Sequence, residues 1–461
     1  MGEGIELANE FKEIDFKSER LEKRFIKTMD KLSKQPDKSV WLASGTRAEA
    51  KAVYRLLGNE RVGKNEILRA HRDSTKQRMQ GHSVILAIQD TTTLNYNNHT
   101  KTEGLGYVSD KILGINIHSC LAVTPEGLTL GVLEQTSYTR PIRKDDTATH
   151  DKKKQRPIEE KESNRWLETM TNSIADMPPE IKFIHVCDRE GDMYELFEKA
   201  AATGNTFLIR VIQNRSAAGG QRIIDEIREM PPSGEISVII PRDSRRNIKE
   251  RKATLKISYK NFDIQKPKLK TVNKNLSHSV NMTVIYVREA QGDREGHEDQ
   301  NIEPIEWILA TNDEIDGFDD AYDKVCNYIQ RWKIERFHYV LKSGCQIEKL
   351  QERSVEKTVL LVLMYSIIAV MILNLTYLAR LFPDTGCDLM FEEDQWQVLY
   401  CAANKTKTPP SGPYSMKEAI EYIARLGGFK GAKSDGSPGV KVIWMGLNKL
   451  YTLLTYREYL T

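Results

Sequence analysis

Three acidic residues stand where a carboxylate could do chemistry: Asp90, Asp188 and Glu335. Asp90 closes the apolar run VILAIQD and Asp188 closes the run FIHVCD, and both runs have the length and composition of short buried strands. A single acid at a strand end most commonly caps a turn. Two such acids can also bind a cation, and carboxylate oxygens suit Mg²⁺ or Mn²⁺. The chain has no cluster of histidine and cysteine residues that would indicate zinc.

Glu335 is the single acid in the basic segment YIQRWKIERFHYVLKSG, residues 328–344. On a helix, where successive residues turn by about 100°, Tyr328, Arg331, Glu335 and Lys342 share one stripe. The apolar residues fall on the other side: Ile334, Phe337, Val340 and Leu341. We therefore expect a helix buried on one face that presents the polar stripe on the other. Taken alone, Arg331 and Glu335 also fit an exposed i,i+4 ion pair, worth only a few tenths of a kcal/mol.

Taken together, the three acids favour metal-dependent phosphodiester chemistry. Two ions about 3.5–4 Å apart would activate a water or a 3′ hydroxyl and stabilise the leaving oxygen. The basic neighbours of Glu335 then have a role, because Arg331 and Lys342 would hold phosphates beside the metals and Tyr328 would hydrogen-bond one. The hypothesis is a nuclease or strand transferase.

The segments around these residues predict an α/β fold. From Ser83 the pattern gives three antiparallel strands, then helix, strand, helix and strand, with a turn around Pro125 to Gly127. This is the order of a ribonuclease-H-like core, a mixed sheet that sets the strands of Asp90 and Asp188 side by side. A helix over residues 320–342 would add Glu335. Between them, residues 215–312 read as an inserted β subdomain of short alternating segments.

Helical segments flank this core on both sides. Residues 10–80 have apolar positions at helical spacing, and residues 387–461 read as a helical tail. The net charge of the 461-residue chain is only +3. Residues 11–80, however, contain 18 lysines and arginines against 10 acidic residues, and residues 241–275 contain 12 against 3. Two basic regions indicate a polyanion held at particular places, although either region alone fits a solvated surface.

Cellular location is indicated by three features. The six cysteines form no C-x-x-C pair, which fits a reducing cytoplasm, and MGEGIELANE lacks the order of a signal peptide. The uncharged stretch Thr358 to Ala379 is long enough to span a bilayer. Because polar residues interrupt it, we favour a helix buried in a large core, with a membrane anchor as the alternative.

A family resemblance rests on the segment that contains Glu335. The spacing Tyr328-x2-Arg331-x3-Glu335-x6-Lys342 resembles the Y-R-E-K signature of the insertion-sequence-four family of bacterial cut-and-paste transposases. AIQDTTTLNY, VCDREGDMYELF and RWKIERFHYVLKSG resemble segments of its transposon-five branch, and the likeness extends to SERLEKRF near the start and IARLGGF in the tail. Arg336 and Tyr339 depart from this pattern, which has glutamate and lysine at their positions.

The resemblance implies a DDE transposase whose catalytic and metal-binding acids are Asp90, Asp188 and Glu335, with two Mg²⁺ ions, or Mn²⁺, in each active site. Such enzymes nick one strand, form a hairpin on the transposon end with the freed 3′ hydroxyl, reopen it with water and join the end to target DNA. The resemblance also implies a set of DNA-contacting residues: Tyr328, Arg331, Lys342, Arg210, Trp307, Lys17 and Arg20. Trp307 would stack on a flipped base; its alternative is a strand residue in a small core.

The resemblance further implies three domains and two partners. Residues 1–80 would recognise the DNA end, residues 81–386 would form the catalytic domain with its insertion at about 215–312, and residues 387–461 would pair two protomers. The partners would be double-stranded DNA, as transposon ends and as target, and a second copy of the chain. The expected location is the bacterial cytoplasm, at the nucleoid and not in a membrane. The alternative function is a catalytically silent DNA-binding regulator of transposition.

Overall fold

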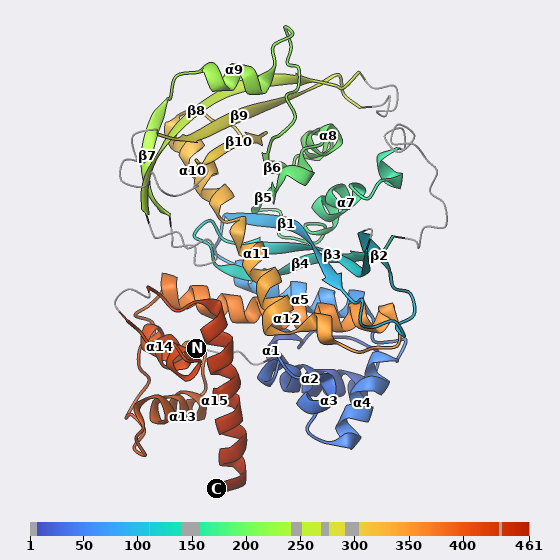
Figure 1. Ribbon diagram of the computed structural model, residues 1–461, viewed down its shortest axis with the longest axis vertical. Helices are drawn as coiled ribbons and strands as arrows, with labels where there is room; N and C mark the ends of the chain where they lie inside the picture. Colours follow the sequence, from blue (N-terminus) through green and yellow to red (C-terminus); the bar gives the residue numbers. More distant parts are fainter. Residues whose placement is uncertain are drawn as a thin grey trace. The chain divides into compact units, whose positions relative to one another are not determined.

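The computed structural model describes residues 7–109, 111–140, 157–240, 251–268, 276–290, 304–432 and 436–460 (Figure 1). The protein is a mixed α/β chain that divides into two compact units. The first unit contains residues 1–82, 90–144 and 332–461, and the second contains residues 83–89 and 145–331. The N-terminal and C-terminal helical segments, far apart in sequence, therefore belong to the same unit.

The predicted N-terminal helices are confirmed in the first unit. They are α1 (Leu7–Glu10), α2 (Glu19–Lys34), α3 (Val40–Ala43), α4 (Arg47–Leu57) and α5 (Lys64–Met79). The apolar residues of α2 that recur at helical spacing, Phe25, Met29 and Leu32, are all buried. Thr46 caps α4 by accepting the backbone N–H of Glu49 at 3.3 Å, which satisfies one of the free donors of the first turn.

An antiparallel hairpin forms the sheet of the first unit. It consists of β3 (Ile112–Val123) and β4 (Thr129–Tyr138), and β2 (Gly106–Ser109) pairs with the start of β3. The turn between β3 and β4 falls where the sequence predicted it. Gly127 adopts a φ of 95° there, which glycine reaches without the strain of a side chain.

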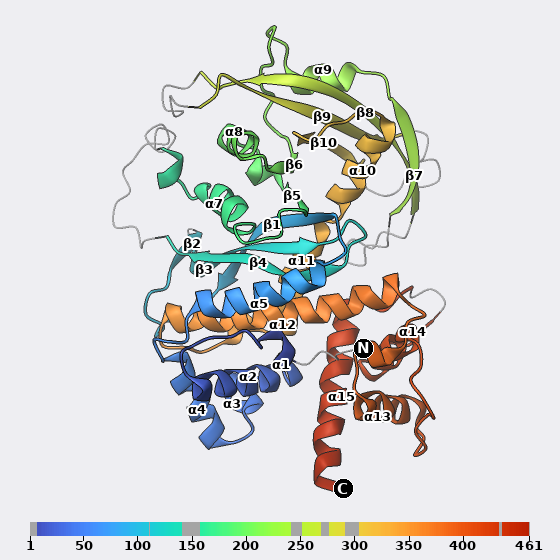
Figure 2. The ribbon, with the colours of Figure 1, turned by 180° about the vertical axis from the view of Figure 1, so that it is seen from behind.

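The long apolar segment forms α12 (Val355–Leu381), and it packs against β4 and α5 (Figure 2). By length and composition it is the single helix among the described residues that could cross a membrane, and 83% of its most apolar window is buried inside the protein. Its polar residues have partners: Asn374 Nδ2 donates to the carbonyl of Thr129 at 2.8 Å, and Gln135 Nε2 donates to Ser366 Oγ at 2.8 Å. The predicted core helix is therefore found in the first unit.

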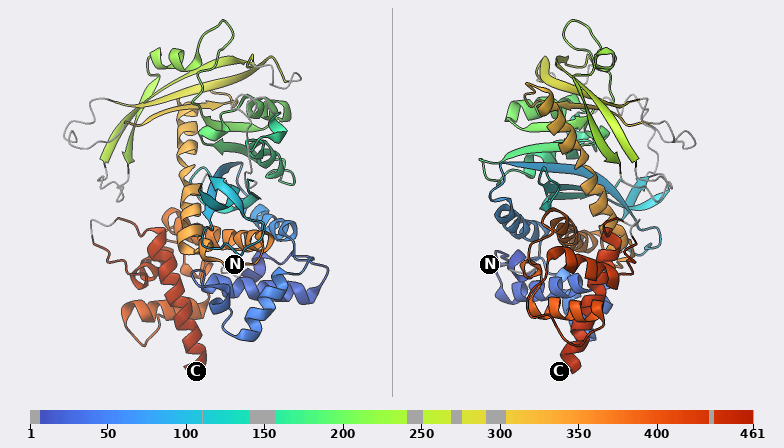
Figure 3. Two further views of the ribbon diagram at one scale, coloured as in Figure 1. Left: turned by 45° about the vertical axis from the view of Figure 1, so that its right-hand side comes forward. Right: turned by 90° about the vertical axis from the view of Figure 1, so that its left-hand side faces the viewer.

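Three helices complete the first unit: α13 (Glu393–Asn404), α14 (Met416–Leu426) and α15 (Val440–Leu460). A capping box opens α14, because Glu418 donates its N–H to Ser415 Oγ and its carboxylate accepts the N–H of Ser415. Figure 3 shows α15 lying beside α13 and α14, which it contacts. Near its middle, Asn448 Nδ2 donates to Asp37 Oδ1 at 3.1 Å, so the tail also packs beside α2.

The second unit contains one sheet with the strand order β1-β5-β6-β10-β9-β8-β7. These strands are β1 (Val84–Asn95, of which residues 84–89 belong here), β5 (Lys182–Cys187), β6 (Thr206–Arg210), β7 (Gly234–Ile240), β8 (Arg251–Gln265), β9 (Ser279–Glu289) and β10 (Glu306–Thr311). The pairs β1–β5 and β5–β6 are parallel and the others are antiparallel. The β segments predicted in residues 215–312 thus exist, and β10 joins them to β6 in the same sheet.

The helices of the second unit within the described residues are α7 (Asn164–Asn172), α8 (Tyr194–Thr203), α9 (Ile223–Glu229) and α10 (Phe318–Ile329). Trp166 of α7 and Phe197 of α8 are fully buried in one apolar cluster with residues of β6, β8, β9 and β10. Ser163, which precedes α7, is of a type that often caps helices, but it has helical dihedral angles and makes no capping hydrogen bond with its side chain.

Two predicted element boundaries are wrong. Asp90 does not end its strand, because the β-branched residues that follow continue β1 to Asn95. The helix predicted over 320–342 is divided into α10, α11 (Trp332–Tyr339) and a π-helical turn over Val340–Gly344. Between α10 and α11 the N–H of Arg331 bonds to the carbonyl of Tyr328, three residues back, which tightens the chain and changes the helical phase.

Candidate nucleic-acid and catalytic site

Asp188 lies directly after β5, as predicted, and opens a 3₁₀ turn over Arg189–Gly191. Its Oδ1 accepts the N–H of Glu190 at 2.8 Å, and the residue is half-buried. One carboxylate oxygen is thus held by the backbone at the carboxyl end of a parallel strand. The capping role that the sequence left open is real, and it fixes the orientation of the side chain.

The pairing of β1 with β5 sets the register of the first two acids. Ile88 pairs with Val186 in parallel. Asp90 stands two residues after Ile88, and Asp188 stands two residues after Val186. Asp90 is half-buried, and its Oδ1 accepts the N–H of Thr91 at 2.7 Å.

Tyr328 is the centre of a group of charged and aromatic residues in the second unit. It is only 4% exposed, so the prediction of an exposed stripe is wrong for this residue. Burial raises the pKa of its phenol to about 12, the positive charges of Arg331 and Arg210 oppose that rise, and the charge of Asp188 adds to it. Its ring lies edge-on to that of Trp307, with centroids 5.7 Å apart. A neutral phenol that can donate a hydrogen bond is therefore surrounded by predicted site residues.

Arg210 is the last residue of β6, again as predicted, and its Nη2 donates to the carbonyl of Glu306 at 3.2 Å. Cys187 pairs with Ile209, so Asp188 and Arg210 follow neighbouring parallel strands at the same register. Parallel strands carry both residues to one edge of the sheet. Arg210 is half-buried.

A buried ion pair that the sequence did not reveal fixes the loop after β6. Asp192 is 2% exposed and pairs with Arg215, which is itself buried. The carboxylate also accepts the N–H groups of Ile212 and Gln213, each at 2.8 Å. Asp192 stands only four residues after Asp188, in the segment CDREGDM, but spacing alone does not distinguish a buried structural acid from a ligand.

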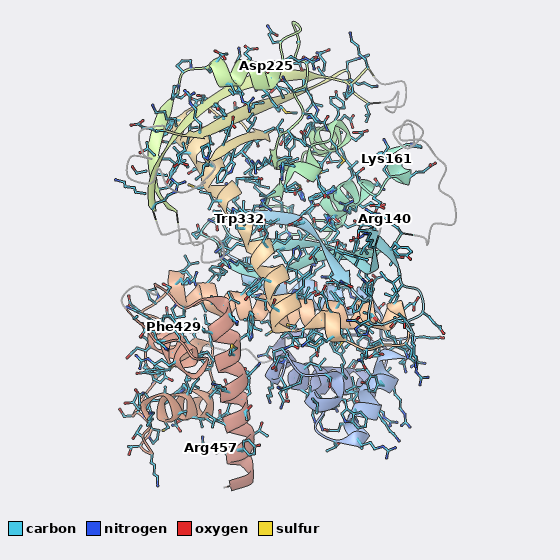
Figure 4. The ribbon with its side chains drawn as sticks, in the orientation of Figure 1. Arg140, Lys161, Asp225, Trp332, Phe429 and Arg457 are labelled. Atoms are coloured by element: carbon cyan, nitrogen blue, oxygen red, sulfur yellow. The ribbon has the colours of Figure 1, made fainter. Side chains whose placement is uncertain are left out.

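Glu335 and Lys342 belong to the first unit. The face predicted to be buried is confirmed, since Ile334, Phe337, Val340 and Leu341 are all fully buried. Glu335 and Lys342 are half-buried, and burial lowers the pKa of Lys342 against the opposing effect of Glu348. Trp332, which opens α11 and is labelled in Figure 4, is 53% exposed and was not selected from the sequence.

The magnesium site expected from the sequence stays a prediction. Within the parts of the chain that the structure describes, no three His, Cys, Asp or Glu side chains are grouped as a metal site. Asp90 and Glu335 belong to the first unit and Asp188 to the second. The donors themselves are carboxylates, whose oxygens are the kind of ligand that suits Mg²⁺.

The two N-terminal residues predicted to contact DNA lie on the surface of the first unit. Lys17 is exposed, adopts a φ of 54° and pairs with Asp15 at 2.5 Å. This ion pair lowers the pKa of Asp15. Arg20 is exposed in the first turn of α2.

Comparison with known proteins gives two family matches and several solved structures. Residues 7–62 match the family described as transposase DNA-binding, and residues 367–460 match the transposase Tn5 dimerisation domain. A solved structure, described as a cryo-EM structure of the piggyBac transposase synaptic complex with hairpin DNA, aligns over 96% of this chain and 73% of that one. Its identity is 10% and its TM-score 0.37, too low to establish a shared fold. The two family matches mark the chain as Tn5-like, with a transposase DNA-binding segment near one end and a Tn5-type dimerisation segment near the other.

Proposed function

We propose that the protein is a DNA transposase that binds transposon ends, cleaves them through a hairpin and joins their 3′ ends to target DNA. The observation that carries this proposal is that Trp307 packs against the ring of Tyr328, while Arg331, Arg210 and Asp188 are near enough for their charges to affect the pKa of its phenol. An acid, two arginines and two aromatic rings in one place suit a distorted DNA end, since they can bind metal, phosphate and base. The mixed sheet that carries Asp188 would be a ribonuclease-H-like core.

The catalytic acids in this proposal are Asp90, Asp188 and Glu335. Asp188 would act from the end of β5, Asp90 from β1 and Glu335 from α11. When bound, two Mg²⁺ or Mn²⁺ ions would activate the attacking oxygen and stabilise the leaving oxygen of each phosphodiester exchange.

The other residues would hold the DNA. Arg210 and Arg331 carry forked donors that match a phosphate, and the neutral hydroxyl of Tyr328 can donate one further hydrogen bond. Lys342 would hold a phosphate as a point charge. Trp307 is half-buried and offers a ring for a flipped base.

The proposal also includes two kinds of partner, DNA and a second protomer. Lys17 and Arg20 would contact the transposon end from the first unit, where residues 7–62 match a DNA-binding family. The Tn5-type dimerisation segment would pair two copies, so that two ends and the target meet in one complex. The protein would act in the bacterial cytoplasm, at the nucleoid.

The test uses purified protein and a DNA fragment carrying the terminal repeats that flank its own coding region. With Mg²⁺, a denaturing gel should resolve a nick, then a hairpin, then a released end. Asp188→Asn and Glu335→Gln should abolish all three products while retaining end binding. The control is Asp225→Asn on α9, exposed and labelled in Figure 4, which should cut normally.

Two outcomes would overturn parts of this proposal. Normal cutting by Asp188→Asn or Glu335→Gln would remove those residues from the catalytic set. End binding without any cleavage in Mg²⁺ or Mn²⁺ would instead favour the catalytically silent regulator.

A further inference from the structure

A cluster of three cations surrounds one aromatic ring in the first unit. Lys333 and Arg336 come from α11, and Arg380 comes from α12. The ring is that of Tyr377: Lys333 Nζ lies 3.2 Å from its centroid and the guanidinium carbon of Arg380 lies 5.2 Å from it. Arg380 is also tied to the tail, because its Nη2 donates to the carbonyl of Pro438 at 2.8 Å.

The three positive charges are close enough to affect each other. Arg336 stands three residues after Lys333, about one turn further along α11. The charges of Arg380 and Arg336 both oppose the rise that burial causes in the pKa of Tyr377. The cluster therefore consists of two cations over the ring and a third on the same turn of α11 as Lys333.

No acid compensates this charge within the part of the chain that the structure describes. Lys333, Arg336 and Arg380 form no ion pair with a carboxylate there. Lys333 is half-buried and lies over an aromatic face, whereas a lysine that merely solvates a surface would extend into water. Like charges held together in this way are stabilised by an anion that binds among them.

We propose that Lys333, Arg336 and Arg380 form a phosphate-binding site for a DNA strand, with Tyr377 as the platform that holds two of the cations. The ligand class rests on the proposed function, since DNA is the polyanion that a transposase binds. DNA presents one charge per about 1.7 Å of its axis, so neighbouring phosphates can meet more than one of these cations.

This site is separate from the one proposed around Glu335. At about 100° per residue, Arg336 lies about 100° and Lys333 about 160° from Glu335 around α11. The phosphate that they hold is therefore not the one at the reacting bond.

The experiment measures binding of a fluorescein-labelled DNA duplex of mixed sequence by fluorescence anisotropy, over a series of KCl concentrations. Divalent metals are left out, so that cleavage plays no part. Lys333→Met, Arg336→Gln and Arg380→Gln should each weaken binding several-fold at low salt and reduce the slope of log K against log salt by about 0.9. Lys333→Met keeps the unbranched apolar stem over Tyr377.

The matched control is Arg425→Gln on α14. Arg425 also lies over a tyrosine of its own helix, 5.5 Å from the Tyr422 ring, and is about half exposed (52%). Unlike the cluster, it has an acid nearby, Glu421 at 4.0 Å. We expect its salt slope to equal that of the unmodified protein.

Three outcomes would overturn the proposal, and they are distinguishable. If the unmodified protein binds the duplex and the three variants keep its slope, the cluster does not hold DNA and the transposase assignment stands. If Arg425→Gln lowers the slope equally, the effect is a general loss of charge. If the unmodified protein does not bind any duplex, the proposed function fails as well. Arg336 and Arg380 are exposed, so their variants decide the matter even if Lys333→Met fails to fold.

Discussion

The rings of Trp307 and Tyr328 meet edge to face, with centroids 5.7 Å apart and planes 62° apart. This contact joins β10 to α10 and orients both side chains, because each ring restricts the rotamers of the other. The aromatic that would stack on a base and the phenol that would bind a phosphate are thus one packed pair. A change at Trp307 therefore has two possible effects, loss of stacking and loss of packing.

Replacement of Trp307 by alanine should remove hairpin formation selectively and retain the first nick. The physical reason is that stacking on an aromatic ring contributes about 1–3 kcal/mol per base, and only the hairpin step requires an extruded base. Trp307→Phe is the control, because it keeps a stacking face and most of the contact with Tyr328. The measurement is the amount of nicked and of hairpin DNA over a time course, read from a denaturing gel. Equal loss of both products would assign Trp307 a structural role.

Loss of the Asp192 carboxylate should destabilise the second unit strongly. Asp192→Ala would leave the guanidinium of Arg215 buried without its partner, which costs about 3–5 kcal/mol. The control is Arg228→Gln, which breaks an ion pair with Glu306 whose side chains are 48% and 42% exposed, and it should cost less than about 1 kcal/mol. Urea unfolding followed by circular dichroism measures both. Equal midpoints for the two variants would contradict the prediction.

Acid should weaken the fold through His185. This residue is fully buried beside Gln89, whose Nε2 lies 3.3 Å from its Nδ1, and burial lowers its pKa to about 3. The native state therefore keeps the ring neutral, whereas the unfolded chain takes up a proton near pH 6.5. The neutral buried ring therefore contributes fully to the free energy of unfolding above about pH 6.5, and this contribution is lost as the pH falls toward 3. Between about pH 7 and pH 5 the loss is on the order of 2 kcal/mol.

The measurement is the free energy of unfolding in urea at several pH values, for the unmodified protein and for His185→Gln. The variant cannot take up this proton, so its stability should fall less steeply with acid. Parallel curves for the two proteins would show that His185 does not carry the effect.

Residues 355–381 should not anchor the protein in a membrane. Ser366 and Asn374 are bonded inside the first unit, and insertion of α12 into lipid would break these bonds and expose the face of β4. After cell lysis without detergent and high-speed centrifugation, we expect the protein in the supernatant, with an integral membrane protein of the host in the pellet as the marker. Sedimentation with that marker, reversed only by detergent, would restore the anchor interpretation.

Local elements could largely be predicted from the sequence because their signals are local. The turn around Gly127, the helix α8 and the strand ends at Asp188 and Arg210 all follow from periodicity and turn residues within about ten positions. The seven-residue helix α9 was missed because two turns give too short a pattern. The pairing of β10 with β6 joins distant segments, and no local pattern encodes it.

Residues for a candidate site could be selected from the sequence, but the way they pack could not be predicted. A single continuous helix put Tyr328 on an exposed stripe, but α10 ends at Ile329 and packs against β6 and β8, and Tyr328 is buried. The cations at Lys333, Arg336 and Arg380 could not be grouped in advance, because their grouping depends on how α12 packs against α11.

The hydrogen bond between Gln135 and Ser366 joins residues 231 positions apart in the chain. A ribosome adding about 5–20 residues per second takes on the order of ten to fifty seconds to make the intervening segment. During that time the face of β4 that α12 covers is bare, and the apolar surface of α5 lacks its partner. The first unit thus matures only as synthesis ends, and a chain that stops before Val355 should be removed by proteases or aggregate, whatever DNA-binding residues it already carries.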